Sequence, residues 1–228
     1  QERPDALLPN LGGQTGLNLA TSLHKLGILE KYKVEIIGVK ADAIERGEDR
    51  LAFKETMKML GIPVPQSEVS HSVEEAEAIA EKLKYPVVLR PAYTLGGTGG
   101  GIAYNVEELR VIVARGLAAS IVHQVLVEES VIGWEELELE VVRDQKNQKI
   151  TVCFIENIDA MGVHTGDSFC AAPMLTVPEK LQKRMQELSY NIVDAIGVVG
   201  GTNIQFAHNL DADRLVAIEI NPRTSRSS

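Results

Sequence analysis

Cysteine and positive charge are both scarce in this sequence. The 228 residues include two cysteines, Cys153 and Cys170, which form no CxxC pair. A disulfide framework is therefore not expected, and we expect a reducing, cytoplasmic compartment. Lys and Arg number 23 against 32 Asp and Glu, which gives a net charge of −9 at pH 7. Binding to nucleic acid requires clustered Lys and Arg that neutralise phosphates, so nucleic acid is not expected as a partner.

Long hydrophobic runs are also missing. No run approaches the roughly 20 apolar residues of a membrane span, and no signal-peptide pattern opens the chain, so no membrane association is expected. The sequence has no internal repeat and no low-complexity segment. Its 44% hydrophobic and 24% charged residues are the ordinary proportions of a globular protein. Because the chain begins with Gln1 and ends in Thr-Ser-Arg-Ser-Ser, we expect it to be a section of a longer protein.

Hydrophobic periodicity predicts a change of architecture along the chain. Residues 5–10, 17–26 and 34–38 are typical of a strand, a helix and a strand, the end of a parallel α/β unit whose earlier strands are missing. Asp49 marks the start of a helix that Gly61 ends. Further helices are expected after Ser72, Asn105 and Thr176, and strands at 85–90, 125–128, 135–143, 150–155, 202–208 and 214–221. The pattern predicts a Rossmann-like remnant followed by an α+β unit of two subdomains, with boundaries near residues 48 and 124.

The final strand, residues 214–221, carries the first functional signal. Alternation predicts an apolar face with Val216, Ile218 and Ile220 and a polar face with Glu219, Asn221 and Arg223. Carboxylate and amide oxygens are ligands that Mg²⁺ takes when it is shared with nucleotide phosphates. An Arg guanidinium suits a planar anion or a phosphoryl group. A sheet edge with a solvated polar face is the alternative interpretation.

A second polar residue, Gln205, is expected to join this face. The short connection at 209–213 predicts that residues 202–208 pair antiparallel with the final strand, which puts Gln205 opposite or diagonal to Glu219. Gln205, Glu219 and Asn221 would then form an oxygen cluster, which favours a Mg²⁺–nucleotide site. A purely structural amide–carboxylate pair is the alternative.

A glycine-rich loop, Thr-Leu-Gly-Gly-Thr-Gly-Gly-Gly, spans residues 94–101. Without Cβ atoms its backbone can approach a polyphosphate and direct several N–H groups at it. It is not a dinucleotide fingerprint, because Ile102 stands at the third glycine position, and it is not a Walker A loop, because no Lys-Ser follows. Arg90, just before the loop, is a natural phosphate contact. The alternatives are a flexible hairpin for the loop and a surface ion pair for Arg90.

Three acidic residues share one face of the strand at 135–143. We expect Glu138 and Glu140 to face solvent and Glu136 to be a cation or ribose partner. His164 is expected to be an ordinary loop histidine. No histidine stands at triad spacing to the acid and hydroxyl at 167–168, so a nucleophilic hydrolase is not indicated.

Four long motifs resemble the large subunit of carbamoyl phosphate synthase. They are Arg90-Pro-Ala-Tyr-Thr-Leu-Gly-Gly-Thr-Gly-Gly-Gly, Gly133-Trp-Glu-Glu-Leu-Glu-Leu-Glu-Val-Val-Arg-Asp, Glu156-Asn-Ile-Asp-Ala-Met-Gly-Val-His-Thr-Gly-Asp-Ser and Glu219-Ile-Asn-Pro-Arg-Thr-Ser-Arg-Ser-Ser. The likeness covers essentially the whole chain, and the glycine loop and the ending are similar to the N-terminal half, which makes carboxyphosphate. It implies a partial Rossmann-like pre-ATP-grasp domain over 1–48 and an ATP-grasp fold with subdomains at 49–124 and 125–228. One segment departs from the family, because Ala172-Pro-Met-Leu-Thr176 stands where Ala-Pro-Ala-Gln-Thr is usual.

The resemblance also implies individual roles. Arg50 and Arg90 would contact the phosphates of ATP, and Gly96 and Gly97 would cover them. Glu129 and Val131 would meet the adenine, Glu136 the ribose, and Gly162, Val163 and His164 would complete the nucleotide pocket. Gln205, Glu219 and Asn221 would hold two Mg²⁺ or Mn²⁺ ions, while Arg223 and Arg226 would hold bicarbonate. A monovalent cation, K⁺, would bind near Glu136 and residues 157–159.

The implied activity is ATP-dependent phosphorylation of bicarbonate, the first step of carbamoyl phosphate synthesis from bicarbonate, ATP and glutamine-derived ammonia. The implied partners are a glutaminase small subunit and the remaining domains of the large subunit, in arginine or pyrimidine biosynthesis. Two other functions stay open at this point. One is another ATP-grasp carboxylate ligase, and the other is a nucleotide-binding module without turnover of its own.

Overall fold

The computed structural model describes residues 2–92, 99–163 and 168–225. The chain forms two compact units, one of Gln1–Val64 with Gly133–Ser228 and one of Pro65–Ile132. These units end at other residues than the subdomain boundaries expected near 48 and 124, which stay predictions about the domains of the family. Cys153 and Cys170 are free thiols. None of the helices in the described ranges has the length and apolar character that crossing a membrane requires.

The first unit opens with the expected parallel α/β segment. Its elements are β1 (Ala6–Leu7), the 3₁₀ helix η1 (Pro9–Leu11), α1 (Gly13–Lys25), α2 (Ile28–Tyr32) and β2 (Glu35–Ile36). β1 pairs with β2 in parallel, which confirms the strand–helix–strand prediction. Helix α3 (Ala41–Glu48) follows and was not predicted, because three of its four buried residues are Ala or Gly and give little hydrophobic periodicity.

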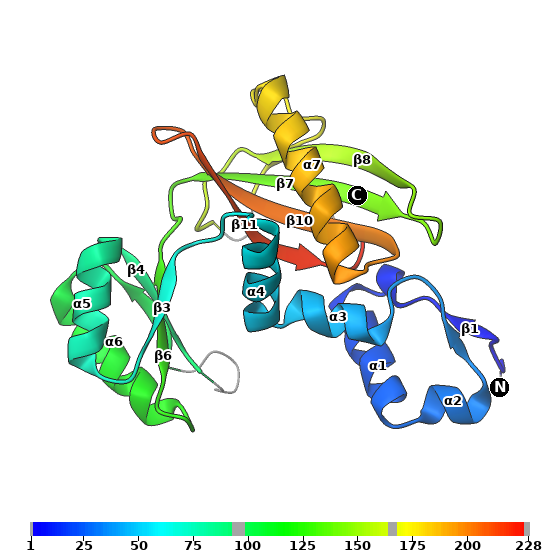
Figure 1. Cartoon of the computed structure of the whole chain (residues 1–228), viewed down its shortest axis with the longest axis horizontal. Coiled ribbons are helices and arrows are strands. Elements are labelled where there is room, and N and C mark those ends of the chain that lie inside the picture. The colour runs from blue at the N-terminus through cyan, green and yellow to red at the C-terminus, as the bar shows by residue number, and fades with distance from the viewer. Residues whose placement is uncertain (1, 93–98, 164–167, 226–228) are drawn as a thin grey trace. The chain divides into compact units, whose positions relative to one another are not determined.

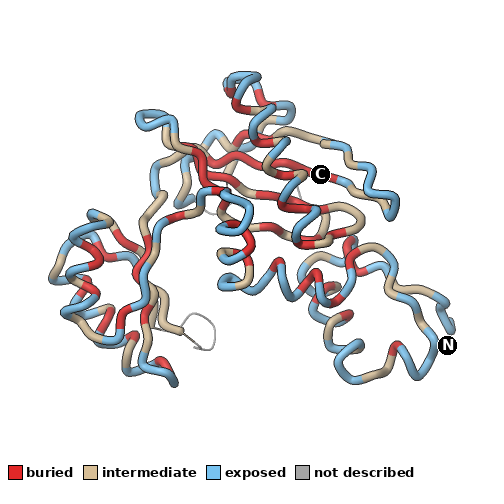
Figure 2. Tube along the Cα trace, viewed as in Figure 1, coloured by how far each residue is buried: buried red, intermediate tan, exposed pale blue. Residues whose placement is uncertain are grey.

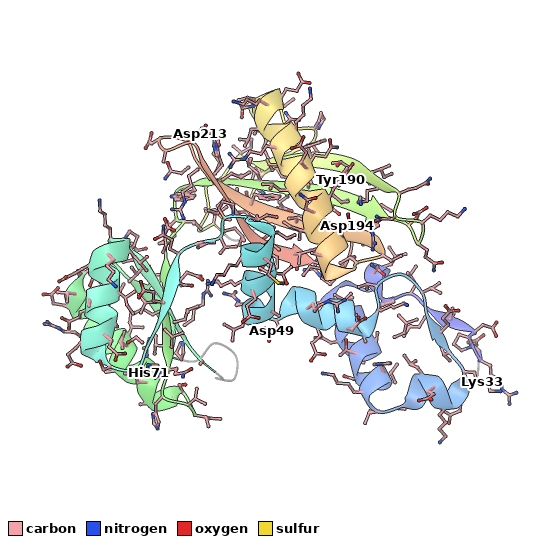
Figure 3. All side chains as sticks on the ribbon, in the orientation of Figure 1. Lys33, Asp49, His71, Tyr190, Asp194 and Asp213 are labelled. Atoms are coloured by element: carbon pink, nitrogen blue, oxygen red, sulfur yellow. The ribbon has the colours of Figure 1, made fainter. Side chains whose placement is uncertain are left out.

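Helix α4 (Arg50–Leu60) begins and ends where its capping residues predict. The Asp49 carboxylate accepts a hydrogen bond from the backbone N–H of Ala52 at 2.8 Å, and Figure 3 labels Asp49 at this end of the helix. Gly61 ends the helix with φ of 66°, a left-handed conformation that glycine adopts without strain. The local sequence alone therefore fixes both ends of α4.

A five-stranded antiparallel sheet forms the main part of the first unit. Its strand order is β11 (Arg214–Asn221), β10 (Gly200–Asn209), β7 (Glu135–Arg143), β8 (Lys149–Asn157) and β9 (Cys170–Ala171). Helix α7 (Glu179–Ile196) lies across one face of the sheet (Figure 1). Met185 and Ile192 of α7 share a buried core with Leu139 of β7 and Phe206 of β10. Figure 2 shows buried residues running along the central strands.

A bulge interrupts the pairing of β10 with β11. Gln205 lies opposite Glu219, but the next residue, Phe206, lies opposite Ala217. Ile218 is therefore an extra residue on β11, and such an insertion shifts the alternation of side chains beyond it.

The shift corrects the prediction for the apolar face of β11. Ala217 before the bulge and Ile220 after it both belong to the core beneath α7. The expectation that Val216, Ile218 and Ile220 share one face is wrong, because the inserted residue places Val216 on the same side as Glu219.

The second unit is a four-stranded antiparallel sheet with two helices. Its strand order is β3 (Ser67–Ser70), β6 (Val125–Glu129), β4 (Val87–Pro91) and β5 (Gly101–Ala103). Helices α5 (Val73–Leu83) and α6 (Val106–Ala119) pack against it and share a separate buried core with β4 and β6 (Figure 1). Both begin at predicted caps, because the side chain of Ser72 accepts from the Glu75 N–H at 3.1 Å and that of Asn105 accepts from the Glu108 N–H at 2.9 Å.

Removing the cap of α4 should destabilise the first unit. Asp49→Ala leaves the Ala52 N–H without its side-chain acceptor, and the free energy of unfolding should fall by about 1 kcal/mol. Asp49→Asn is the matched control, because the amide oxygen can still accept this hydrogen bond. Urea denaturation followed by circular dichroism measures both variants. Equal stability of Asp49→Ala and the wild type would contradict the assignment of the cap.

Candidate nucleotide and metal site

Gln205 and Glu219 lie directly opposite each other on β10 and β11. This confirms the predicted cross-strand pair. Two residues further along, Asn203 lies opposite Asn221 on the same face. The pairing thus gathers a carboxylate and three amide groups on the face of the sheet that points away from α7.

Hydrogen bonds join the side chains at the end of β11 into a row. Asn221 Nδ2 donates to Glu219 Oε1 at 3.0 Å, and Arg223 Nη2 donates to Asn221 Oδ1 at 3.1 Å. Arg223 Nε also donates to Oε1 of Gln14, on α1, at 3.5 Å. The three residues therefore lie on one side of the strand end, as the sequence predicted.

The donor atoms of this row determine what it can bind. Gln205 and Asn221 offer amide oxygens, Glu219 offers one carboxylate, and all three residues are half-buried. Within residues 2–92, 99–163 and 168–225, no group of three or more His, Cys, Asp or Glu is placed to hold a metal ion. A metal ion at this row would thus take only part of its ligands from the protein. Mg²⁺ shared with nucleotide phosphates is bound in this way, so the donor set fits such an ion.

Strand β7 adds buried acidic residues to the same face. Glu138 lies opposite Gln205, and Glu140 lies opposite Asn203. Glu136, Glu138 and Glu140 are only 4%, 4% and 3% exposed, so the expectation that Glu138 and Glu140 face solvent is wrong. β7 is the central strand, with β10 on one side and β8 on the other, so it has no edge that faces solvent.

Two asparagines provide hydrogen bonds to these acids. Asn203 Nδ2 donates to Glu138 at 2.8 Å and to Glu140 at 2.9 Å, and Asn157 Nδ2 donates to Glu138 at 3.0 Å. Hydrogen bonds to a charged acceptor offset part of the cost of removing it from water. This role of Asn203 was not predicted from the sequence, because the acids that accept its hydrogen bonds were expected to face solvent.

The environment of this face favours positive charge. Burial raises the pKa of Glu136 to about 7, and repulsion from Glu138 and Glu219 acts in the same direction. Burial also raises the pKa of Glu140, against the opposing effect of hydrogen bonds from Ser225 and Asn203. Carboxylates that are buried and repel each other are stabilised by a nearby cation.

Arg90 stands near the end of β4 in the second unit. Its Nε donates to Glu128 Oε1 at 3.2 Å, and the Glu128 side chain is 10% exposed against 42% for Arg90. The buried carboxylate thus orients a partly exposed guanidinium, and a phosphate contact of Arg90 stays a prediction. Glu129 ends β6, where its backbone N–H donates to the Gln66 carbonyl at 2.8 Å, and Val131 follows it as a half-buried residue.

The other expected site residues are distributed along the chain. Arg50 is the exposed first residue of α4, and Gly162 (φ of 113°) and Val163 follow β8. In the expected K⁺ region, the Asp159 carboxylate accepts from the backbone N–H of Phe169 at 3.1 Å. Four expected residues lie outside the described residues: Gly96, Gly97, His164 and Arg226.

The raised pKa of Glu136 predicts a pH dependence of stability. Its carboxyl group ionises near pH 4.5 in the unfolded chain and near pH 7 in the folded one, so its contribution to stability falls as pH rises between these values and stays lost above them. Glu136→Gln should remove this dependence and raise the free energy of unfolding at pH 8 by roughly 3 kcal/mol.

Denaturation in EDTA, without nucleotide, from pH 4.5 to pH 8.5 measures the effect. The exposed Glu187 gives a matched control, because Glu187→Gln removes a carboxylate from the surface of α7 and should leave the pH profile as in the wild type. Parallel pH profiles of Glu136→Gln and the wild type would contradict the raised pKa.

Two family models match the chain. The "Carbamoyl phosphate synthase preATP-grasp domain" matches residues 1–46, and the "Carbamoyl-phosphate synthase L chain, ATP binding domain" matches residues 49–228. The carbamoyl phosphate synthase large chain of Archaeoglobus fulgidus is 56% identical over 229 residues, which cover 100% of this chain and 21% of that one. The carbamoyl phosphate synthase large chain, N-terminal section, of Methanopyrus kandleri is 54% identical over 228 residues, which cover 100% of this chain and 40% of that one. The chain thus spans between about a fifth and two fifths of the length of these relatives.

Solved structures with the same fold are more distant in sequence. The biotin carboxylase domain of 2-oxoglutarate carboxylase from Hydrogenobacter thermophilus has a TM-score of 0.74 at 23% identity, over 97% of this chain and 49% of that one. D-alanyl-alanine synthetase A from Vibrio cholerae has a TM-score of 0.73 at 15% identity, over 96% of this chain and 67% of that one. At this identity the likeness shows the fold alone. Together with the two family models it confirms the resemblance found in the sequence: the chain belongs to the carbamoyl phosphate synthase large-chain family, as a section made of the preATP-grasp domain and the ATP-binding domain.

Proposed function

We propose that this chain phosphorylates bicarbonate with ATP to give carboxyphosphate, the first step of carbamoyl phosphate synthesis. The observation that carries the proposal is the row formed by Gln205, Glu219, Asn221 and Arg223, which places oxygen donors for a metal ion beside a guanidinium for an anion. A reaction between a metal-bound polyphosphate and a small anion requires these two kinds of group next to each other.

In this proposal Gln205, Glu219 and Asn221 hold two Mg²⁺ or Mn²⁺ ions together with the phosphates of ATP. These ions, when bound, neutralise charge on the β- and γ-phosphoryl oxygens. The donor set supports this, because one carboxylate and two amides leave coordination positions for phosphate oxygens. The buried acids Glu136 and Glu138 add negative potential that favours the ions.

Arg223 would hold bicarbonate through its remaining N–H groups. An oxygen of bicarbonate then attacks the γ-phosphorus, the bond from this phosphorus to the bridging oxygen breaks, and ADP leaves with the bonding electron pair. Arg223 stabilises the dianionic product beside it. No covalent bond to the protein is required, so positioning and electrostatic stabilisation supply the catalysis.

The remaining roles come from the family resemblance. Arg50 and Arg90 would contact phosphates, Glu129 and Val131 the adenine, and Glu136 the ribose, with Gly162 and Val163 completing the nucleotide pocket. The carboxylase domain from Hydrogenobacter thermophilus was solved in complex with MgADP, ADP and bicarbonate, so the same fold accommodates these molecules there. We extend this ligand class, and K⁺ near residues 157–159, to the present chain.

The proposal places the chain in a larger cytoplasmic enzyme. The relatives are named large chains, and one is named as an N-terminal section of a large chain. We therefore propose that the remaining large-chain domains and a glutaminase small subunit, which supplies ammonia, are its partners. The product would serve arginine or pyrimidine biosynthesis.

Replacing the single carboxylate of the row tests the proposal. Glu219→Gln should weaken binding of Mg²⁺–ATP and lower bicarbonate-dependent ATP turnover by about 100-fold, because the amide cannot match the charge of the carboxylate. Turnover is measured as ADP release in carbonate-free buffer, with and without added bicarbonate, and affinity is measured by calorimetry. The surface variant Glu187→Gln controls for loss of a carboxylate elsewhere.

The outcomes separate the three functions. Stimulation by bicarbonate that Glu219→Gln abolishes supports carboxyphosphate formation. Stimulation by another carboxylate substrate, but not by bicarbonate, identifies a different ATP-grasp ligase. Mg²⁺–ATP binding without any turnover identifies a binding module. Unchanged affinity and turnover in Glu219→Gln would show that this row is not the metal site.

A further inference from the structure

Asn10 is far in sequence from the residues of the candidate site, but it forms hydrogen bonds with the backbone of the segments that carry them. The residue lies in η1, between β1 and α1, and is 2% exposed. Its Nδ2 donates to the carbonyl oxygens of Val199 at 3.4 Å, Gly201 at 3.2 Å and Pro222 at 3.3 Å. Its Oδ1 accepts from the backbone N–H of Val39 at 2.9 Å. One side chain thus connects the start of β10, the segment after β2 and the segment after β11.

The main chain of Asn10 also forms hydrogen bonds with the residue that follows Arg223. The Asn10 carbonyl oxygen accepts from the backbone N–H of Thr224 at 3.1 Å and from Thr224 Oγ1 at 3.3 Å. Pro222 and Thr224 are the two neighbours of Arg223 in the chain. Asn10 therefore brackets Arg223 with bonds to the residue before it and the residue after it.

The space around the Asn10 side chain is closed by two glycines with positive φ. Gly38 has φ of 81° and Gly200 has φ of 95°. A Cβ atom on Gly38 would overlap Asn10 Oδ1, and one on Gly200 would lie 3.0 Å from Asn10 Nδ2. Both backbones approach the amide more closely than a residue with a side chain would allow. The pocket is thus shaped around an amide side chain.

We propose that Asn10 is a positioning residue that sets the placement of Arg223 and Asn221. The proposal rests on the function proposed for the row. The Arg223 side chain starts from a backbone that Asn10 holds on both sides, and its guanidinium then reaches Asn221 Oδ1 and Gln14 Oε1. Gln14 lies four residues after Asn10, at the start of α1. The N-terminal segment therefore restrains both the backbone of Arg223 and its guanidinium group.

The chemistry of the amide accounts for the choice of residue. Three carbonyl oxygens face Nδ2, and one N–H faces Oδ1. Aspartate has nearly the same shape and could still accept from Val39. Its second carboxylate oxygen, however, would face three carbonyl oxygens, and none of these four atoms can donate a hydrogen bond. Repulsion from the Pro222 carbonyl would then displace the turn that carries Arg223.

Asn10→Asp in the full chain tests the proposal. Arg223 holds bicarbonate in the proposed reaction, and a misplacement of about 1 Å is enough to weaken one contact selectively. The KM for bicarbonate should therefore rise about tenfold, while the KM for ATP should stay within about twofold. The Thr224 amide should also exchange its hydrogen about tenfold faster, while that of Ile204, in the middle of β10, should not change. Leu17→Ala is the matched control, because Leu17 is a fully buried residue of α1 whose truncation destabilises the same region, while its apolar side chain cannot hydrogen-bond to the turn.

The control separates positioning from stability. If Leu17→Ala and Asn10→Asp have the same ratio of bicarbonate KM to ATP KM, the role of Asn10 is only structural and the proposal fails. If Asn10→Asp does not fold, Thr224→Val replaces it, because this variant removes only the hydroxyl bond to the Asn10 carbonyl. It should raise the bicarbonate KM about threefold, and an unchanged KM in Thr224→Val overturns the proposal.

Hydrogen exchange keeps this inference separate from the proposed function. If the wild-type chain shows no bicarbonate-dependent turnover, the proposed function fails for this chain. The hydrogen-exchange measurement then tests the positioning role of Asn10 by itself. Faster exchange confined to the Thr224 turn in Asn10→Asp supports the positioning role. Wild-type protection of Thr224 in that variant overturns it.

Discussion

The bulge at Ile218 determines which side chains of β11 reach the polar face of the sheet. Ala217 points into the core beneath α7, so strict alternation would send Glu219 into the same core, against Phe206 and Met185. Burying a carboxylate there without a partner would cost several kcal/mol. One inserted residue reverses the direction, so that Ile220 joins the core instead and Glu219 meets Gln205. The candidate site therefore depends on a local irregularity of the backbone.

Two opposite electrostatic requirements meet at the end of β11. Burial, and then repulsion from Glu138 and Glu219, raises the pKa of Glu136, so this region carries negative potential, and Arg223 places a positive charge at its edge. A cation near Glu219 and an anion near Arg223 would each reduce the repulsion that the other feels. This adjacency supports the proposed transfer of a phosphoryl group from a metal-bound polyphosphate to a small anion.

Local signals in the sequence predicted more of the fold than of the site. Asp49 and its helix depend on contacts within four residues, and this information is present in the local sequence. The alternation of β7 was equally clear, but whether Glu138 faces water depends on the central place of β7 in the sheet, which no local pattern encodes. The bulge left no compositional mark, because Ile218 is an ordinary strand residue. The bonds from Asn10 to Val199, Gly201, Pro222 and Thr224 span 189 to 214 residues, so they could not be found without the fold.

The N-terminal segment is structurally part of the ATP-binding region, although the family models divide the chain between residues 46 and 49. Leu17 and Ile44 share one buried core with Met185 of α7. Arg46 donates two hydrogen bonds, at 3.1 and 2.8 Å, to the carbonyl of Ile196, where α7 ends. Removal of this segment would expose apolar surface of α7, leave the Ile196 carbonyl without its partner, and release the turn that carries Arg223. The backbone of Arg223, the residue proposed to hold the anion, is thus positioned by contacts with the preATP-grasp segment, and such positioning is what a reaction between two bound groups requires.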